Sequence, residues 1–213
     1  MEKSTSKCKK CKRVGEKIFL KGEKCSSPKC PITRSASKQT RKGSMGRAKR
    51  KNLSEYGTQL AEKQKAKFGY GLREKQFKNY VKLAAGKGTS NTPAEIYNLL
   101  ESRLDNTVFR IGLADSRNVA RQMVSHGHIL VNGGKVDIPS YKTKIGEKIS
   151  VRPQSVGKGL FKDIDLKLKK YTPPLWIILD KEKLVGEIKS VPSFSDEPAI
   201  EARLITVVEF YNR

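Results

Sequence analysis

Apolar side chains recur at helical spacing through the middle of the chain, with one clear interruption. The pattern from Leu53 to Leu83 is broken by the tetrapeptide Phe68–Gly71, which predicts two helices joined by a glycine turn. A second helical pattern begins where Thr92 offers a cap and Pro93 suits the first turn, and its apolar stripe runs to Gly112. We expect one further helix over this stretch.

A short basic helix directly precedes a hairpin signal between Ser116 and Gly133, SRNVARQMVSHGHILVNG. Asp115 or Ser116 can cap this helix, and its apolar positions fall on one side. Arg117 and Arg121 lie four residues apart on another side. The closing Asn-Gly pair predicts a tight turn followed by a return strand. The two arginines should therefore lie beside a rigid loop, on a surface suited to folded RNA.

Five later segments complete an α+β pattern. Lys135–Ile138 is the expected return strand, and Lys142–Val151 supplies another strand. Leu175–Leu179 and Val185–Val191 are apolar and also predict strands. The last block, Ala199–Tyr211, fits a helix or a strand, and we favour the helix.

The charge of the chain indicates a polyanionic partner. Its 45 basic and 21 acidic side chains give a net charge of +24, of which residues 1–51 carry +15, residues 52–155 carry +8 and residues 156–213 carry +1. Nucleic acid is the commonest partner for so much positive charge, and an anionic membrane surface is the rival. No apolar run approaches the roughly 20 residues that span a bilayer, and no secretory signal opens the sequence. We therefore expect a cytoplasmic protein that binds nucleic acid.

All four cysteines lie in the first 30 residues, with the spacing of a single metal site. Cys8 and Cys11 form a C-x2-C pair, and Cys25 and Cys30 form a C-x4-C pair after thirteen intervening residues. Four thiolates suit one structural zinc ion, whose binding energy would replace the hydrophobic core that this segment lacks. An iron–sulfur cluster and two disulfides are the alternatives, and a reducing compartment disfavours the disulfides. Basic side chains beside the first pair are candidates for contact with nucleic acid: Lys9, Lys10 and Arg13.

Residues 31–51 are rich in Ser, Gly, Lys and Arg and have no periodic apolar positions. This composition predicts disorder in the free chain. The segment is either a solvated charged linker or an arm that becomes ordered against phosphates. We favour the arm, with Arg47 and Arg50 among its RNA contacts.

Several separated motifs resemble the family of bacterial small-subunit ribosomal protein S4. They are the cysteine pairs, KAKFGYGLREKQFKNY at 65–80, LLESRLDNTVFRIGLADSRNVARQMVSHGHILVNG at 99–133, VDIPSY at 136–141 and the closing VVEFYNR. The resemblance implies an α+β protein in three parts. Residues 1–45 would form a four-cysteine zinc knuckle and basic arm, residues 46–93 with 172–213 a discontinuous helical domain, and residues 94–171 an inserted RNA-binding domain of a helix pair and a small β-sheet.

The resemblance also implies a function. Members of this family are constituents of the small ribosomal subunit that bind the five-way junction in the 5′ domain of its RNA and nucleate assembly of the subunit body. They lie near the channel through which messenger RNA enters, contact ribosomal protein S5 and neighbouring small-subunit proteins, and influence translational accuracy. We expect a cytoplasmic ribosomal protein with no small-molecule substrate. By motif position the resemblance implies RNA contacts from Lys65, Lys67, Tyr70, Arg73, Lys75, Arg103, Arg117, Arg121, His126 and His128.

Two other functions share some of these features. RNA-modifying enzymes and a tyrosine-tRNA ligase carry the same kind of RNA-binding domain, but the sequence has no enzyme motif and no second domain of enzyme size. Its only histidines, His126 and His128, have no obvious carboxylate partner. A zinc-dependent regulator that binds nucleic acid would fit the cysteines, but no recognition helix follows them. We expect that the chain is not an enzyme.

Overall fold

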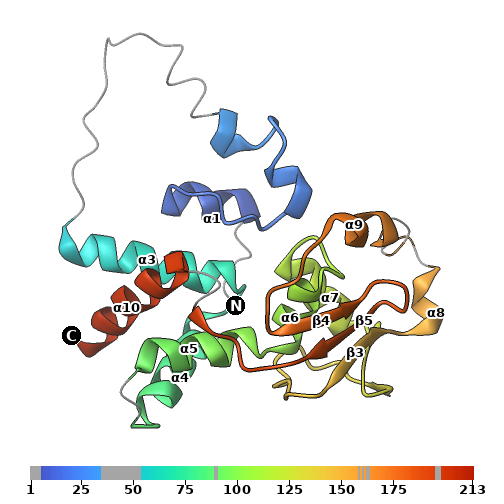
Figure 1. The fold of residues 1–213 in the computed structure, drawn as a ribbon. Coiled ribbons are helices and arrows are strands. Elements are labelled where there is room, and N and C mark those ends of the chain that lie inside the picture. Colours follow the sequence, from blue (N-terminus) through green and yellow to red (C-terminus); the bar gives the residue numbers. More distant parts are fainter. Residues whose placement is uncertain are drawn as a thin grey trace.

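A group of helices and a five-stranded antiparallel sheet form two neighbouring hydrophobic cores (Figure 1). The computed structural model describes most of the chain: residues 6–34, 54–88, 91–157, 159, 161, 164–194 and 198–213. Most of the predicted basic arm, with Arg47 and Arg50, lies outside the described residues. The combination of helices with a small antiparallel sheet confirms the α+β expectation.

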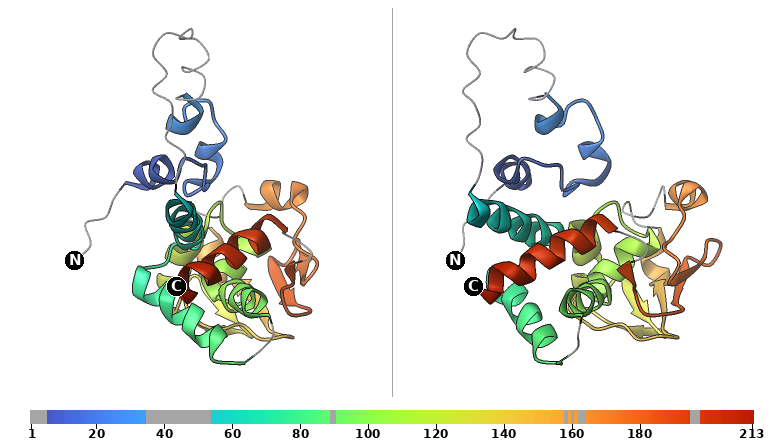
Figure 2. Two further views of the ribbon diagram at one scale, coloured as in Figure 1. Left: turned by 90° about the vertical axis from the view of Figure 1, so that its left-hand side faces the viewer. Right: turned by 60° about the vertical axis from the view of Figure 1, so that its left-hand side comes forward.

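Helices from two distant parts of the chain build the first core: α3 (Glu55–Gly69), α4 (Glu74–Ala85), α5 (Thr92–Glu101) and α10 (Pro198–Asn212). Their apolar faces meet around side chains that are fully buried, among them Phe77, Ile96, Leu100 and Leu204. Both views of Figure 2 place α10 beside α3. The two helices around the glycine turn and the helix favoured for the last block are therefore confirmed.

The single helix expected from Thr92 to Gly112 is wrong, because the structure has two helices there, α5 and α6 (Leu104–Ile111). Between them Arg103 has an extended backbone (φ −74°, ψ 138°) and forms an isolated antiparallel bridge with Lys142. The next amide, that of Leu104, donates to the carbonyl of Tyr141 at 2.8 Å. A distant segment thus supplies the hydrogen bonds that interrupt the helix.

The second core lies between two helices, α6 and α7 (Arg117–Ser125), and the sheet. The sheet has the order β2-β1-β3-β5-β4 and consists of β1 (Ile129–Val131), β2 (Gly134–Lys135), β3 (Lys148–Val151), β4 (Ile177–Asp180) and β5 (Val185–Ile188). Two short helices follow β3: α8 (Pro153–Val156) and α9 (Ile164–Lys170). Asn132 and Gly133 both have positive φ, 50° and 81°, as a two-residue hairpin turn requires. The hairpin is therefore confirmed, but only Lys135 of the expected return strand Lys135–Ile138 belongs to β2, which begins at Gly134.

Side-chain caps fix the starts of α5 and α7. Asn91 caps α5, because its Oδ1 accepts from the amide of Ala94 at 3.1 Å. Thr92 is therefore the first helical residue rather than the cap. At α7 the hydroxyl of Ser116 accepts from the amide of Val119 at 3.4 Å, so of the two candidate caps Ser116 fills that position.

The strands expected within Leu175–Leu179 and Val185–Val191 are confirmed as β4 and β5, and they enlarge the sheet. β5 pairs with β3, and β4 forms the edge beside β5. This pairing buries Trp176 in the core of the sheet, although the predicted boundaries assign residues 172–213 to the helical domain. Conversely, α5 packs in the helical core, although it falls within the predicted 94–171 domain. The two cores therefore do not follow the predicted domain boundaries. Where independently folding units begin and end stays a prediction.

The cysteine segment (residues 6–34) contains α1 (Lys7–Val14) and a short 3-10 helix, η1 (Gly22–Cys25), and lies against the rest of the molecule (Figure 2). Gly22 has φ +60°, and a Cβ added to it would lie 2.6 Å from the carbonyl oxygen of Asp115. Glu16 accepts from Lys65 at 3.0 Å and from Arg203 at 3.4 Å. Both the backbone and the ion pairs therefore hold this segment in place. None of the described helices is long and apolar enough to cross a membrane.

Candidate nucleic-acid interface

Three basic segments that are far apart in the sequence lie side by side in the structure. The start of α7 contacts the turn between α3 and α4, where the guanidinium carbon of Arg117 lies 4.7 Å from the ring centre of Tyr70. The next residue of α7, Asn118, donates from Nδ2 to the carbonyl of Leu20 in the cysteine segment at 3.3 Å. The fold thus joins the cysteine segment, the turn after α3 and α7, all of which the sequence predicts to bind RNA.

Arg117 is held in one orientation by two aromatic rings, a side-chain amide and a carboxylate. Its guanidinium lies between the rings of Tyr70 and Phe109, 4.7 Å from each ring centre. Its Nε donates to Oδ1 of Asn106 at 2.6 Å, and Nη2 lies 3.6 Å from Oε1 of Glu101. The side chain is 20% exposed. Only the part of this side chain that stays exposed can therefore meet a phosphate.

Glu101 is a fully buried carboxylate at the centre of this arrangement. Arg110 donates to it twice, at 2.7 and 3.0 Å, the Tyr70 hydroxyl donates at 2.7 Å, and Nδ2 of Asn106 donates at 2.8 Å. Burial alone would raise the pKa of the Glu101 carboxyl, but Arg110, Arg117 and Tyr70 outweigh it and hold that pKa below its usual value. Burial, followed by the adjacent carboxylate, raises the pKa of the Tyr70 hydroxyl well above its usual value. Glu101 therefore stays ionised and orients two arginines from α6 and α7.

Arg103 lies inside the molecule, although it is a predicted RNA contact. It is 2% exposed and forms a two-point pair with Asp105, with Nε to Oδ1 at 3.0 Å and Nη2 to Oδ2 at 2.7 Å. Its Nη1 donates to the hydroxyl of Tyr80 at 2.6 Å. Arg121 approaches the same carboxylate at 3.4 Å and is more exposed. Since no donor of Arg103 faces solvent in this arrangement, its place is structural, and we do not keep it among the proposed contacts.

A second carboxylate holds two of the lysines of α3. Glu74, at the start of α4, accepts from the ammonium groups of Lys63 and Lys67, each at 2.7 Å. Burial would raise the pKa of the Glu74 carboxyl, but these two lysines lower it to about 2. Lys67 is therefore also engaged inside the protein, whereas its predicted neighbours Arg73 and Lys75 are exposed and form no ion pair with another described residue.

The other predicted contact residues differ in exposure. Those that are exposed are Lys9, Arg13, Arg73, Lys75 and His126. Those that are partly exposed are Lys10, Lys65, Arg117 and Arg121. Those that are buried are Lys67, Tyr70, Arg103 and His128. Nδ1 of His128, the residue before β1, lies 3.0 Å from the hydroxyl of Ser155 in α8. The exposed and partly exposed groups are the ones that a phosphate can reach.

The four cysteines gather around one small cavity of about 20 Å³ in the cysteine segment. None of them forms a disulfide, and Cys11, Cys25 and Cys30 are buried. The amide of Lys21 donates to Sγ of Cys25 at 3.4 Å. Within the described residues, however, no group of three or more Cys, His, Asp or Glu side chains is close enough to hold a metal ion. The donor set and the amide contact suit a metal thiolate site, but the sulfurs do not share one coordination sphere here.

Comparison with known proteins decides between the possible classes of nucleic-acid-binding protein. Residues 2–101 match the family described as Ribosomal protein S4/S9 N-terminal domain, and residues 102–149 match the S4 domain. Small ribosomal subunit protein uS4A of Alkaliphilus metalliredigens is 46% identical over 207 residues, which cover 97% of this chain and 96% of that protein. Small ribosomal subunit protein uS4 of Halothermothrix orenii is also 46% identical over 207 residues, with the same coverage, and that of Gloeobacter violaceus is 44% identical over 206, again covering 97% and 96%. The chain belongs to the ribosomal protein S4 family. This confirms the resemblance inferred from the motifs.

The two matched regions of this S4-family chain meet where the structure breaks the helix. The first ends at Glu101 and the second begins at Ser102, next to the extended residue Arg103. Glu101 contacts Tyr70 before the boundary and Arg110 after it. The buried carboxylate of Glu101 therefore links the two matched regions, and both regions contribute basic residues to the candidate interface.

The acidic half of this site was not predicted from the sequence. Glu74, Glu101 and Asp105 decide which basic side chains are held inside, yet none was among the candidate residues. Glu101 did carry a signal, because helical spacing places it four residues after Tyr97 and three before Leu104, beside the apolar stripe. An ionisable group at such a position is buried only when it is paired.

Proposed function

We propose that this chain is a constituent of the small ribosomal subunit that binds the five-way junction in the 5′ domain of its RNA and nucleates assembly there. Membership of the S4 family supports this proposal. The observation that carries it is the convergence of the cysteine segment, the turn after α3 and α7, because one folded RNA can contact all three at once. The protein acts in the cytoplasmic ribosome.

Recognition in this proposal depends on phosphate positions and RNA shape rather than on base edges. Arg73, Lys75, Lys9 and Arg13 present exposed charge, while Arg117 presents the exposed part of a fixed side chain. Arginine and lysine contacts of this kind fix the register of a protein on RNA and carry little sequence information. The contact between Arg117 and the Tyr70 ring would set the distance between the phosphate contacts of α7 and those of the turn after α3.

The test is binding to the junction RNA across a salt series, against an unrelated folded RNA of equal length. Arg73→Ala with Lys75→Ala should weaken junction binding and reduce the salt slope by about 2, since each lost phosphate contact removes about 1. Lys82→Ala with Lys170→Ala removes the same charge from two exposed residues that are not among the proposed contacts and is the matched control. Equal losses in both double variants would leave only a non-specific basic protein and would refute the proposal.

The finer partners are also proposals. Contact with ribosomal protein S5 and neighbouring small-subunit proteins, a place near the channel where messenger RNA enters, and an influence on accuracy rest on the resemblance. The family relationship, and not any missing feature of the structure, supports a structural role over an enzymatic one. Particles reconstituted with and without this protein should differ in S5 incorporation, and unchanged incorporation would count against that contact.

We further propose one structural zinc ion on Cys8, Cys11, Cys25 and Cys30. The support is that all four thiols line one cavity in a segment with little apolar core. When bound, zinc would cross-link α1 to η1 and the residues after it. Elemental analysis of the purified protein should give one zinc per chain, which Cys8→Ser with Cys25→Ser abolishes. Iron with visible absorption would indicate a cluster instead, and four titratable thiols without metal would reject both.

Chelation tests the role of this metal separately from its presence. Removing zinc should broaden or shift the amide signals of the cysteine segment while residues 94–171 keep their folded spectrum, because the sheet core contains no cysteine. Loss of signals throughout the chain, or from neither region, would contradict a local structural role.

A further inference from the structure

The loop before η1 in the cysteine segment is held at the start of α7 by one uncharged side chain. Nδ2 of Asn118 donates to the carbonyl of Leu20 at 3.3 Å. Oδ1 of the same side chain lies 3.8 Å from the position that a Cβ on Gly71 would take, in the turn between α3 and α4. Asn118 directly follows Arg117, so its amide lies where the cysteine segment, the turn after α3 and α7 meet.

The backbone of this loop has a conformation that needs support from its surroundings. Phe19 has φ 53°, which is uncommon for an aromatic residue, and Gly22 has φ 60°. The amide of Gly22 donates to the carbonyl of Phe19 at 3.2 Å, and Leu20 between them is 5% exposed. A strained backbone of this kind persists where neighbouring contacts hold it. The bond from Asn118 to Leu20 is one of those contacts.

A lysine of α9 makes a second link between η1 and the residues just before α7. Nζ of Lys167 lies 2.8 Å from Oδ1 of Asp115 and 3.2 Å from Oε1 of Glu23. The side chain of Lys167 is 38% exposed and that of Glu23 is 73% exposed, so solvent weakens this link. A single hydrogen bond is also a modest contribution. Because each link is weak, losing the Asn118 bond should loosen the loop.

Two exposed cations belong to this loop and to η1, Lys21 and Lys24. The main chain of Lys21 is fixed, because its amide donates to Sγ of Cys25 at 3.4 Å. Holding the loop at Asn118 therefore keeps both lysines at a set distance from Arg117 before any RNA binds. Cations that are already fixed relative to one another lose less freedom on binding, and the second contact becomes an intramolecular step.

We propose that Asn118 is a positioning residue for RNA binding, which holds the loop so that Lys21 and Lys24 meet phosphates at a fixed distance from Arg117. This inference rests on the proposed function and adds two phosphate contacts to it. Asn118 carries no charge, and its Nδ2 is engaged by the carbonyl of Leu20. It therefore acts on the RNA through the two lysines rather than by direct contact.

A double-mutant cycle on the full chain separates positioning from a purely structural role. Asn118→Ala should weaken binding to the junction RNA about fivefold, as expected for one lost hydrogen bond, and should leave the salt slope unchanged because no cation is removed. Lys21→Ala with Lys24→Ala should weaken binding and reduce the slope by about 2. In the chain that lacks both lysines, Asn118→Ala should have almost no further effect, since the loop then has no cation to position.

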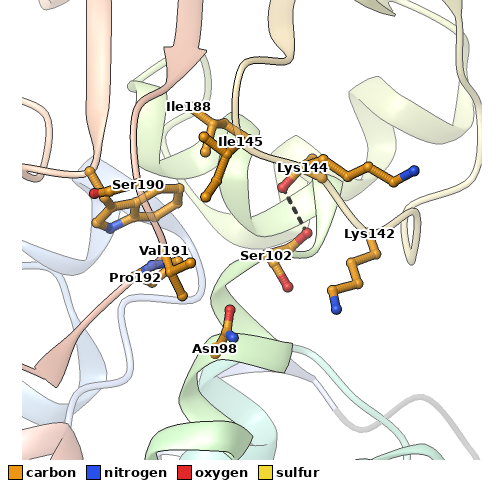
Figure 3. A pocket seen from close by; sticks show the side chains of 11 residues that line it. Asn98, Ser102, Lys142, Lys144, Ile145, Ile188, Ser190, Val191 and Pro192 are labelled. Atoms are coloured by element: carbon orange, nitrogen blue, oxygen red, sulfur yellow. Dashed lines mark hydrogen bonds between the residues drawn. The ribbon is translucent and has the colours of Figure 1, made fainter.

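Two matched controls accompany this cycle. Gln122→Ala removes an exposed amide from the same helix, four residues further on, and should change neither the affinity nor the amide exchange of Gly22, which Asn118→Ala should speed. Lys142→Ala with Lys144→Ala removes two exposed charges from the loop that lines a cavity of about 220 Å³ beside the end of α5 (Figure 3). This second control should leave the salt slope unchanged, because neither lysine is among the proposed contacts.

Three outcomes would overturn the proposal. Equal losses from Asn118→Ala with and without the two lysines would mean that the residue supports α7 and not the loop. Unchanged affinity in Asn118→Ala would mean that the loop needs no positioning, and an unchanged slope in Lys21→Ala with Lys24→Ala would mean that these lysines do not meet phosphates. The proposed function is measured separately, by the preference of the wild type for the junction RNA over an unrelated folded RNA of equal length. That preference can hold while the positioning role fails.

Discussion

Replacing Glu101 with Gln should destabilise the protein far more than the same change elsewhere on α5. The variant keeps the size of the side chain but removes the only negative charge that contacts both Arg110 and Arg117 among the described residues. Glu101 is fully buried, and the side chains of Arg110 and Arg117 are 13% and 20% exposed, so water can replace the lost charge only in part. Breaking a buried pair on one side costs about 3 to 5 kcal/mol. Since both arginines retain some solvent contact, we expect about 3 kcal/mol, at the lower end of that range.

The matched control is Glu95→Gln, which is on the same helix. Glu95 pairs with Lys87 at 2.6 Å, but the side chain of Lys87 is 38% exposed. A surface pair of this kind contributes about 1 kcal/mol or less, even when the helix dipole is included. Urea unfolding at neutral pH, followed by circular dichroism and by Trp176 fluorescence, should therefore separate the two variants by about 2 kcal/mol.

The pH dependence provides a second check on the same carboxylate. The pKa of Glu101 is lower in the folded protein than in the unfolded chain, so its ionised form stabilises the fold above the unfolded pKa of about 4.3. That stabilisation is lost as the pH falls through the folded pKa. The difference between the wild type and Glu101→Gln should therefore be constant near neutrality and shrink in acid. Equal losses in Glu101→Gln and Glu95→Gln, or a difference that grows in acid, would refute a buried ionised hub.

Three further predictions concern the surface and its supports. Arg117→Ala with Arg121→Ala should weaken binding to the junction RNA and lower the salt slope in filter binding, and unchanged affinity and slope would reject the assignment of α7. Gly22→Ala should speed amide exchange across the cysteine segment, because its Cβ would meet Asp115 at 2.6 Å. Gly15→Ala, also at positive φ but with nothing within 4 Å, should affect only its own turn. Equal exchange in the two variants would contradict the packing of the cysteine segment against Asp115. Tyr80→Phe should cost about 1.5 to 3 kcal/mol in urea unfolding, because it removes the hydroxyl that bonds to the buried Arg103, and a change below about 0.5 kcal/mol would show that Asp105 alone suffices.

The sequence predicted those elements whose hydrogen bonds are local. The glycine turn between α3 and α4, the Asn132-Gly133 hairpin and the Ser116 cap depend on residues within a few positions of one another. The break after Glu101 could not be found in the same way. It depends on the bridge between Arg103 and the distant residue Lys142, and helical periodicity continues through it unchanged.

The candidate site was predictable in position but not in the state of each side chain. The motifs located both basic regions, and the structure brings them together at Tyr70 and Arg117. Whether a given arginine faces solvent, however, depends on its acidic partner. Asp105 is only two residues from Arg103, yet the burial of Arg103 also needs Tyr80, on another helix, whose hydroxyl accepts from Nη1 of the arginine. Side-chain burial of this kind is a property of the assembled core and has no periodic signal.

The distribution of acidic partners explains how a chain with net charge +24 can present a selective surface. Glu74, Glu101 and Asp105 each neutralise basic groups that lie in or near the two cores. Arg73 and Lys75 have no such described partner, are exposed, and follow closely in sequence on Tyr70, which Arg117 contacts. The interior pairs therefore fix the geometry, and the unpaired groups provide the attraction. Replacing an interior acid with its amide would make the net charge of the protein more positive. It would nevertheless weaken RNA binding, because the arginine that the acid orients would no longer hold its position. For Glu101→Gln this means a lower affinity for the junction despite a higher net charge, whereas a purely electrostatic surface would bind more tightly.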